Sequence, residues 1–185
     1  MPKFLIIYGS VDGQTLKIAE HIAEIVRTRT DFQVDGFNAA DLPADFSISG
    51  YQRILIGSSL RNRKYHPAVI KFIREYRDDL QQLPSDFYSV SLGDATCMRR
   101  GVSKILKKLF EETAWQPRAV GRFAGALLYT KYDHWTKTFM GLAGWIMRYP
   151  TDTSRDHELT NWEDVDKFAD EILKGLSSQA PEPQA

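Results

Sequence analysis

Hydrophobic positions along the chain follow two different periods. Short apolar runs, typical of strands buried on both faces, occur at residues 3–8, 53–57 and 87–92. Between the first two runs, residues 15–28 carry apolar side chains every three or four positions, which is the spacing of an amphipathic helix. Alternation of such strands and helices predicts an α/β fold in which helices cover both faces of a parallel sheet.

Weaker patterns complete this alternation. Further strands are predicted at 32–37 and 120–129. A helix is predicted from Pro67, a residue that suits the first turn, and its apolar face reaches Leu80.

The last part of the chain departs from the alternation. Residues 130–159 separate the fifth predicted strand from the last helix, and this connection is too long for an ordinary loop. The last helix opens with Thr160 and Glu163, the pattern of a capping box. We therefore expect one domain over residues 1–175 with an insertion at 130–159, followed by a disordered, Ser- and Pro-rich tail at 176–185.

The loop after the first strand has the composition of a phosphate site. It reads Ser10, Val11, Asp12, Gly13, Gln14 and Thr15, and a helix begins at once. Backbone N–H groups at the helix start would face an anion, Ser10 and Thr15 would add hydroxyl donors, and Gly13 would admit close approach. The glycine patterns of a P-loop and of a dinucleotide fingerprint are absent. A plain strand-to-helix turn with a capping side chain is the alternative.

This loop and several later segments together resemble a known family. Residues 10–15 resemble the FMN-phosphate loop of flavodoxins. Residues 12–15, with Ile18 and Ala19 after them, resemble the flavodoxin-like protoporphyrinogen dehydrogenases of bacterial haem synthesis, which pass electrons to menaquinone. Further matches follow in order between residues 3 and 174, at 56–61, 65–66, 87–92, 124–127, 151–153 and 161–163.

The resemblance implies a fold, a cofactor and a reaction. The fold is a flavodoxin-like, doubly wound, five-stranded parallel sheet of order 2-1-3-4-5, and the cofactor is FMN. The reaction is the oxidation of protoporphyrinogen IX to protoporphyrin IX, with menaquinone or ubiquinone as the next acceptor. A soluble flavodoxin-type electron carrier is the alternative. The implied flavin-binding residues are Ser10, Val11, Asp12, Gly13, Gln14, Thr15, Ser58, Ser59, Leu60, Arg61, Tyr65 and Leu92. Gly93 and Asp94 are also expected to bind the flavin, because of their place after the fourth strand.

Three cations fall at the carboxyl end of the third strand, where open α/β sheets bind ligands: Arg61, Arg63 and Lys64. A unit charge about 6 Å from the flavin, at an effective dielectric of about 20, would favour its anionic reduced form by roughly 2–3 kcal/mol before salt screening. The same cations could pair with the carboxylates of a porphyrinogen. A solvated loop is the alternative. Tyr65, which follows, would either stack on the flavin ring or pack the loop.

The loop after the fourth strand does not match the family pattern. Residues 93–100 are nevertheless expected to flank the flavin ring. Within them, Cys97 is interpreted as a small apolar residue near a pocket rather than as a reactive thiol. Because Cys97 is the chain's one cysteine, no internal disulfide can form, which fits a reducing compartment.

The insertion carries an apolar stripe. Trp135, Phe139, Leu142, Ile146 and Tyr149 are spaced by four, three, four and three residues, which predicts a helix over 134–149. Bulky aromatic residues with cations nearby suit a membrane surface or the entrance to a quinone site. The predicted location is therefore cytoplasmic and peripheral on the inner face of the cell membrane. A helix packed on the sheet or in a homo-oligomer interface is the alternative.

Composition excludes several other classes. The 24 basic and 24 acidic residues cancel, and no segment is basic enough for nucleic-acid binding. An electron-carrying flavoprotein usually presents an acidic face, so this balance counts against the carrier alternative. No apolar run approaches the length of a transmembrane helix. The histidines are not grouped with carboxylates at metal-ligand spacing, so no metal site is expected, and the flavin should supply the redox chemistry.

Overall fold

The computed structural model describes residues 1–95, 98–127, 152 and 155–177, and the statements below concern those residues. Its main sheet is parallel and has the strand order β2-β1-β3-β5-β6. The order agrees with the predicted order 2-1-3-4-5, because β5 and β6 are the fourth and fifth parallel strands. The label β4 belongs to a short additional strand that pairs antiparallel with the end of β3. The bounds are β1 Lys3–Gly9, β2 Gln33–Asn38, β3 Arg53–Arg61, β4 Lys64–Tyr65, β5 Ser85–Ser91 and β6 Val120–Ala124.

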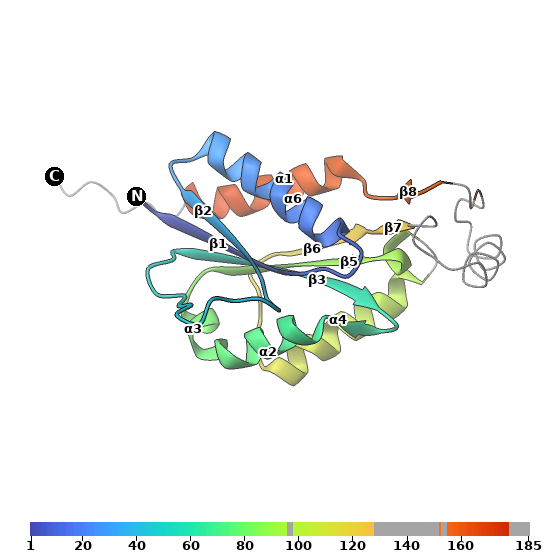
Figure 1. Ribbon diagram of the computed structural model, residues 1–185, viewed down its shortest axis with the longest axis horizontal. Helices are drawn as coiled ribbons and strands as arrows, with labels where there is room; N and C mark the ends of the chain where they lie inside the picture. The colour runs from blue at the N-terminus through green and yellow to red at the C-terminus, as the bar shows by residue number, and fades with distance from the viewer. Residues whose placement is uncertain (96–97, 128–151, 153–154, 178–185) are drawn as a thin grey trace.

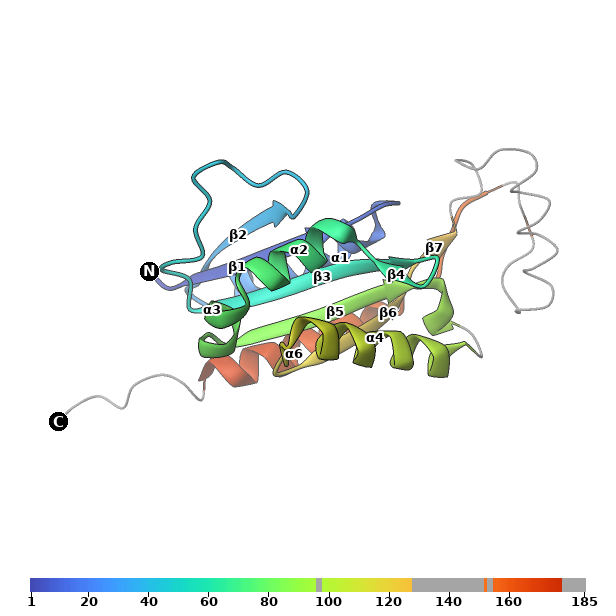
Figure 2. The ribbon, with the colours of Figure 1, turned by 90° about the horizontal axis from the view of Figure 1, so that it is seen from below.

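Helices cover both faces of this sheet, as predicted (Figure 1). On one face lie α1 (Gln14–Arg29) and α6 (Trp162–Ser177). On the other lie α2 (Pro67–Glu75), α3 (Arg77–Gln82) and α4 (Arg99–Thr113). Figure 2 shows α2 and α4 side by side on this second face.

The core is divided by the sheet into two clusters. In β1, Phe4 and Ile6 point toward α1 and α6, whereas Leu5 and Ile7 point toward α2 and α4. All four side chains are at most 1% exposed. A central parallel strand is covered on both faces, so it carries a continuous apolar run rather than an alternating pattern. The interpretation of residues 3–8 as such a strand is confirmed.

Two helix boundaries differ from the prediction. The helix that begins at Pro67 breaks at Tyr76, whose φ of −103° and ψ of 20° separate α2 from α3. The predicted capping box is wrong, because Asn161 rather than Thr160 accepts a hydrogen bond from the backbone N–H of Glu163, at 3.1 Å. The Thr160 hydroxyl donates instead to the carbonyl of Ala124 at 2.8 Å, so a tertiary contact replaces the local cap.

The fifth predicted strand also divides. β6 ends at Ala124, and β7 (Ala126–Leu127) then pairs antiparallel with β8 (His157–Glu158). The predicted insertion thus starts and ends at neighbouring strands. The helix predicted over 134–149 lies outside the described residues, as do Cys97 and residues 178–185.

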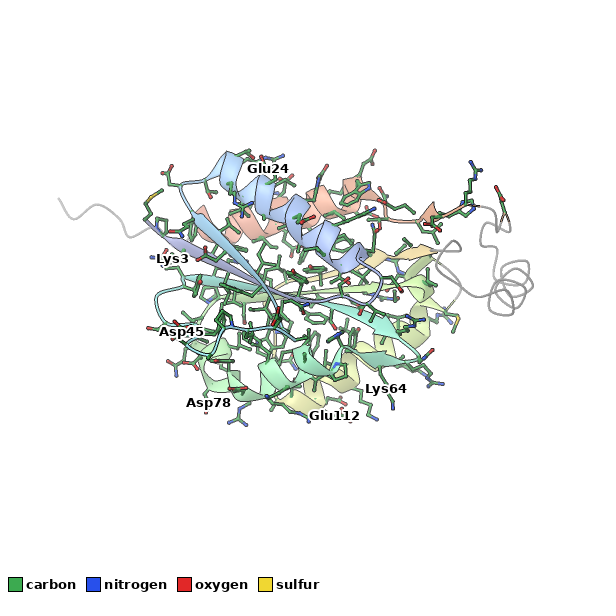
Figure 3. All side chains as sticks on the ribbon, in the orientation of Figure 1. Lys3, Glu24, Asp45, Lys64, Asp78 and Glu112 are labelled. Carbon is green, nitrogen blue, oxygen red and sulfur yellow. The ribbon has the colours of Figure 1, made fainter. Side chains whose placement is uncertain are left out.

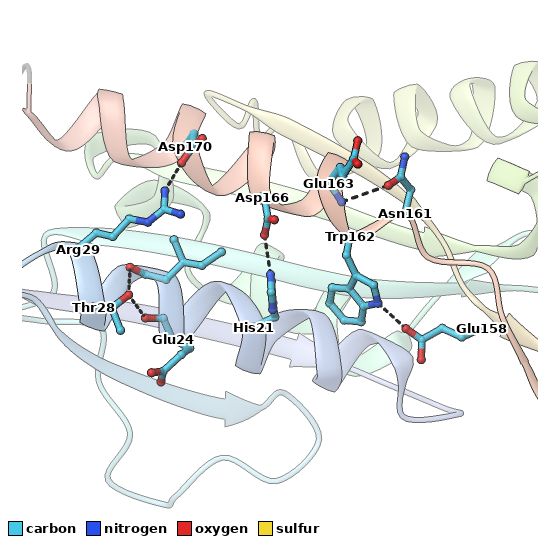
Figure 4. A network of polar contacts seen from close by, with 11 residues as sticks. His21, Glu24, Thr28, Arg29, Glu158, Asn161, Trp162, Glu163, Asp166 and Asp170 are labelled. Carbon is cyan, nitrogen blue, oxygen red and sulfur yellow. Dashed lines mark hydrogen bonds and ion pairs between the residues drawn. The ribbon is translucent and has the colours of Figure 1, made fainter.

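A polar network holds α6 on α1, the helix that follows the predicted phosphate loop (Figure 4). Arg29 pairs with Asp170 at 2.5 Å, and His21 contacts Asp166 at 2.6 Å. These side chains are about half exposed, so each contact adds little stability by itself. Together they fix the orientation of α1.

None of the helices in the described part of the chain is both long and apolar enough to cross a bilayer.

A buried ion pair links β3 and β5 at the amino-terminal ends of the strands. Arg53 at the start of β3 donates to both carboxylate oxygens of Asp86 in β5, at 2.6 and 3.0 Å. Their side chains are 2% and 0% exposed. Asp86 also accepts a hydrogen bond from the backbone N–H of Ala119 at 3.2 Å, which ties in the start of β6. The pair is far from the carboxyl edge of the sheet.

Candidate functional site

The carboxyl ends of β1, β3 and β5 meet at one edge of the sheet, and the loops that follow them form the candidate site (Figure 1). The chain leaves β1 for β2 on one side and returns to β3 on the other, so the strand order reverses between β1 and β3. Open α/β sheets bind ligands at such a reversal. The candidate site therefore consists of the loops at residues 10–13, 60–65 and 92–95.

The predicted phosphate loop, residues 10–15, begins with a turn that a side-chain hydrogen bond closes. Ser10 Oγ accepts a hydrogen bond from the N–H of Gly13 at 3.0 Å. Gly13 has a φ of +92°, and a Cβ added there would meet no atom within 4 Å. Backbone conformation rather than crowding therefore requires glycine at this position, and the space beside it is open to a ligand.

The start of α1 leaves hydrogen-bond donors for that ligand. No side chain caps the helix, its first turn holds no acidic residue, and its first helical bond runs from Lys17 N to Gly13 O at 3.1 Å. The preceding N–H groups are the donors that an isolated helix end cannot satisfy. An anion such as a phosphate fits these donors.

The first turn of α1 is also fixed from below. Tyr88 in β5, which is fully buried, donates its hydroxyl hydrogen to the carbonyl of Thr15 at 2.9 Å. Its ring passes over Gly57, where an added Cβ would lie 2.0 Å from the Tyr88 ring. The Gln14 side chain donates to the Thr160 hydroxyl at 2.8 Å, so it faces α6 rather than the site. Only the backbone of Gln14 remains for a ligand.

A hairpin of residues 60–65, here called the cationic hairpin, follows β3 at the same edge. Its two turn residues, Asn62 and Arg63, have φ values of 49° and 62°, as a two-residue type I′ turn requires. Arg61 Nη1 lies 3.5 Å from the Asp12 carboxylate, which joins the hairpin to the phosphate loop and offsets the acidic charge there.

The other two cations of this hairpin face water. Arg63 and Lys64 are exposed, and neither forms an ion pair with another residue of the described ranges. In Figure 3, Lys64 lies toward the right of the molecule, whereas Asp45 and Asp78 lie toward the left. The two cations are thus available to an anionic ligand at the site.

Below the hairpin lie two buried polar atoms without a hydrogen-bond partner in the described structure, Ser59 Oγ and His66 Nδ1. The His66 ring packs on the end of β1, since a Cβ on Gly9 would lie 2.7 Å from His66 Cγ. Ser58 is used internally, because its hydroxyl accepts from the His66 N–H at 3.1 Å. The sequence analysis placed His66 in a segment that resembles the family but gave it no role in the site.

Tyr65 does not present its ring to the site. It is 3% exposed, its hydroxyl donates to Ser89 Oγ at 3.1 Å, and its ring packs edge to face on Phe87, with 5.6 Å between ring centroids. Burial raises the pKa of Tyr65 to about 12. The stacking role considered for Tyr65 is therefore wrong for this structure, because β4 folds back along β3 and turns the side chain into the core.

The third loop is a 3-10 turn, Leu92–Ala95, in which Asp94 is held by other side chains. The Asp94 carboxylate accepts from the Ser91 hydroxyl at 2.7 Å and pairs with Arg122 of β6. It is 3% exposed, so the protein rather than a ligand occupies it. Sequence reasoning missed Arg122, although an arginine inside the short strand β6 was a usable signal.

The structure thus gathers most of the predicted residues at one edge and separates their roles. Ser10 and Gly13 close the turn of the predicted phosphate loop, in which Val11 is half exposed and Thr15 is 1% exposed. Leu60 packs partly on the core below the hairpin. In the described ranges no three His, Cys, Asp or Glu residues gather in a way that could hold a metal ion.

Comparison with known proteins adds sequence relatives to this geometry. Residues 5–154 match the family described as Flavodoxin domain. The chain is 31% identical over 172 residues to protoporphyrinogen IX dehydrogenase (quinone) of Escherichia coli K12, which covers 92% of this chain and 94% of that protein. It is 26% identical over 186 residues to the protein of the same name from Leishmania major, covering 100% of this chain and 80% of that protein.

Solved structures share the fold. Oxidised flavodoxin 1 from Bacillus cereus superimposes with a TM-score of 0.56 at 17% identity, over 96% of this chain and 99% of that one. Rubredoxin oxygen:oxidoreductase from Desulfovibrio gigas gives a TM-score of 0.54 at 18% identity, over 95% of this chain and 36% of that one. At these identities the likeness concerns the fold alone.

Proposed function

The chain belongs to the flavodoxin domain family, and from that premise we propose that it is an FMN-dependent dehydrogenase that oxidises protoporphyrinogen IX and passes the electrons to a membrane quinone. The relatives of that name make it a flavodoxin-like oxidoreductase, and family membership indicates FMN as its cofactor. The observation that carries the proposed substrate is the cationic hairpin, which presents two exposed cations, without an ion-pair partner among the described residues, beside the predicted phosphate loop.

The described residues fit FMN. The open backbone at Gly13 and the uncapped start of α1 suit its terminal phosphate, with the Ser10 hydroxyl as a further donor. The flavin ring would lie between Leu60 of the cationic hairpin and the Leu92–Ala95 turn, by the rule that ligands extend along the carboxyl edge. When bound, FMN supplies the acceptor for a hydride from the substrate. Denatured protein should release FMN rather than FAD, because the loop has room for one terminal phosphate.

The cations of the hairpin would have separate tasks. Arg61 is paired with Asp12, so its charge offsets that carboxylate and leaves the phosphate loop without net negative charge. Arg63 and Lys64 remain to bind the carboxylates of a porphyrinogen, and arginine does so through two parallel hydrogen bonds. Arg63 keeps a left-handed backbone where glycine is usual, which is a conformational cost consistent with a role for its side chain.

Contact with the membrane is the remaining part of the proposal. The helix predicted over 134–149 would lie on the inner face of the cell membrane and open the site to menaquinone or ubiquinone. Its apolar stripe and nearby cations support this assignment, and the antiparallel pair β7–β8 brings both ends of the insertion to the carboxyl edge.

An anaerobic assay with protoporphyrinogen IX, with and without a menaquinone analogue, tests the proposal. Purified FMN-loaded protein should form porphyrin when the menaquinone analogue is added in excess over the flavin. It should form none when the analogue is left out. The double variant Arg63→Gln, Lys64→Gln should raise KM with little effect on kcat, because substrate binding is lost before the reacting atoms are affected. Lys107→Gln, Lys108→Gln on α4 removes the same charge from two surface pairs and should leave both constants unchanged.

Two results would contradict the proposal. If loaded protein forms no porphyrin with or without the quinone, it is not this dehydrogenase. If it instead exchanges single electrons rapidly with a flavodoxin reductase, the alternative of a soluble electron carrier is the correct one.

A further inference from the structure

Arg122 joins three segments at the edge of the site, although it belongs to none of the loops that form it. From β6, its Nη2 pairs with the Asp94 carboxylate in the Leu92–Ala95 turn. Its Nη1 donates to the Ser103 hydroxyl at 2.7 Å, and its Nη2 also donates to the carbonyl of Arg99 at 2.8 Å. One guanidinium thus connects the turn, β6 and the start of α4.

Asp94 is held on its other side as well. The Ser91 hydroxyl, at the end of β5, donates to the carboxylate at 2.7 Å, and the Asp94 N–H donates back to the same hydroxyl at 3.2 Å. The turn also lies close to α4, since a Cβ on Gly93 would be 2.8 Å from a methyl carbon of Val102. The turn is therefore fixed to β5, β6 and α4 together.

The burial of this pair makes it more than a surface contact. The side chain of Asp94 is 3% exposed and that of Arg122 is 18% exposed. Removing two charges from water is unfavourable, and apolar side chains could hold a loop at lower cost. An arginine also fixes the orientation of the group that it binds, because the N–H donors of its planar guanidinium point in set directions.

We propose that Arg122, acting through Asp94, is a positioning residue that sets the Leu92–Ala95 turn against the flavin ring, independently of the loop that binds the phosphate. A ligand whose phosphate lies at the β1 loop extends across β3 toward the turn after β5. The turn is then a wall of the ring half of the site. This inference rests on FMN binding at the carboxyl edge and not on the identity of the substrate.

Riboflavin separates the two halves, because it has the ring of FMN without the phosphate. Apoprotein is titrated with each ligand, and quenching of flavin fluorescence gives the two dissociation constants. Arg122→Gln and Asp94→Asn should each raise the FMN and riboflavin dissociation constants by the same factor. We expect about 10- to 100-fold, by analogy with residues that orient metal ligands from behind. The double variant should add little to the larger single effect, because the two residues act as a unit.

Three further variants serve as comparisons. Arg122→Lys keeps the charge but not the fork, so it should restore only part of the lost affinity. Ser10→Ala alters the phosphate loop and should weaken FMN while leaving riboflavin unchanged. Arg29→Gln breaks an exposed Arg–Asp pair at the far end of α1 and should change neither constant.

The proposal is overturned if folded Arg122→Gln changes both constants by less than about twofold, or weakens FMN without weakening riboflavin. Far-ultraviolet circular dichroism and the thermal midpoint of each apoprotein show whether it is folded. If Arg122→Gln does not fold, the isosteric Asp94→Asn decides the matter. If neither folds, the pair serves the fold and the proposal is wrong. Porphyrinogen oxidation has no part in this test, so its failure would leave the proposed reaction untouched.

Discussion

Replacing Gly13 by Ala tests whether the backbone of the phosphate loop contacts the ligand. At a φ of +92° any residue with a Cβ is strained, by about 1–2 kcal/mol in the left-handed region. No atom lies within 4 Å of the added carbon, so crowding in the free protein contributes nothing. A bound phosphate would hold the loop in this conformation, so FMN-loaded protein bears the whole cost. If the loop relaxes in the free protein, the FMN dissociation constant rises by up to about 5- to 30-fold.

Gly50 provides a matched control. Its φ is +86°, and an added Cβ would likewise meet nothing within 4 Å, but it precedes β3 at the opposite edge of the sheet. Gly50→Ala should lose about 1–2 kcal/mol of unfolding free energy with FMN affinity unchanged. Urea unfolding of the apoproteins gives the stability, and fluorescence titration gives the affinities for FMN and riboflavin.

The comparison gives a clear refutation. If Gly13→Ala loses less stability than Gly50→Ala, which shows that its loop relaxes in the free protein, and still binds FMN as tightly as the parent protein, the backbone at Gly13 does not contact the phosphate. If riboflavin is weakened as much as FMN, the loop acts on the ring and its assignment to the phosphate is wrong.

Further predictions concern the rest of the molecule. Changing the three cations of the cationic hairpin to Gln should lower the two-electron potential of bound FMN, and unchanged potentiometry would make them simple surface charge. Asp86→Asn leaves Arg53 buried without a charged partner and should cost about 3–5 kcal/mol in urea unfolding, whereas a loss below about 1 kcal/mol would contradict this. The pKa of Tyr65 is about 12 in the folded protein against 10.0 as its ordinary value, so the folded state holds the proton more tightly. Stability should therefore fall between about pH 10 and 12, and less steeply in Tyr65→Phe. Trp135→Glu with Ile146→Glu should abolish co-sedimentation with anionic vesicles while FMN binding persists, and loss of FMN would mean that the stripe is core.

Contiguous features of the chain were readable from the sequence because they depend on near neighbours. A strand covered on both faces needs an unbroken apolar run, so residues 3–8 identified β1 without knowledge of its partners. The phosphate loop is also local: Ser10 and Gly13 are three residues apart and bond directly to each other. Strand order followed from the family resemblance, and the structure confirms it.

The tertiary structure decided the partners of polar side chains, because strand pairing brings together residues that are distant along the chain. Arg122 pairs with Asp94 only because β5 and β6 are neighbours in the sheet. Thr160 does not cap its own helix, because its hydroxyl donates to the carbonyl of Ala124 instead. Of the two roles left open for Tyr65, the tertiary structure decided for packing rather than stacking, for the same reason. Its sequence position is beside the site, but two residues of antiparallel pairing turn its ring into the core. Periodicity records which side chains are buried, whereas the contacts that give each one its role are set by the packing of the whole sheet.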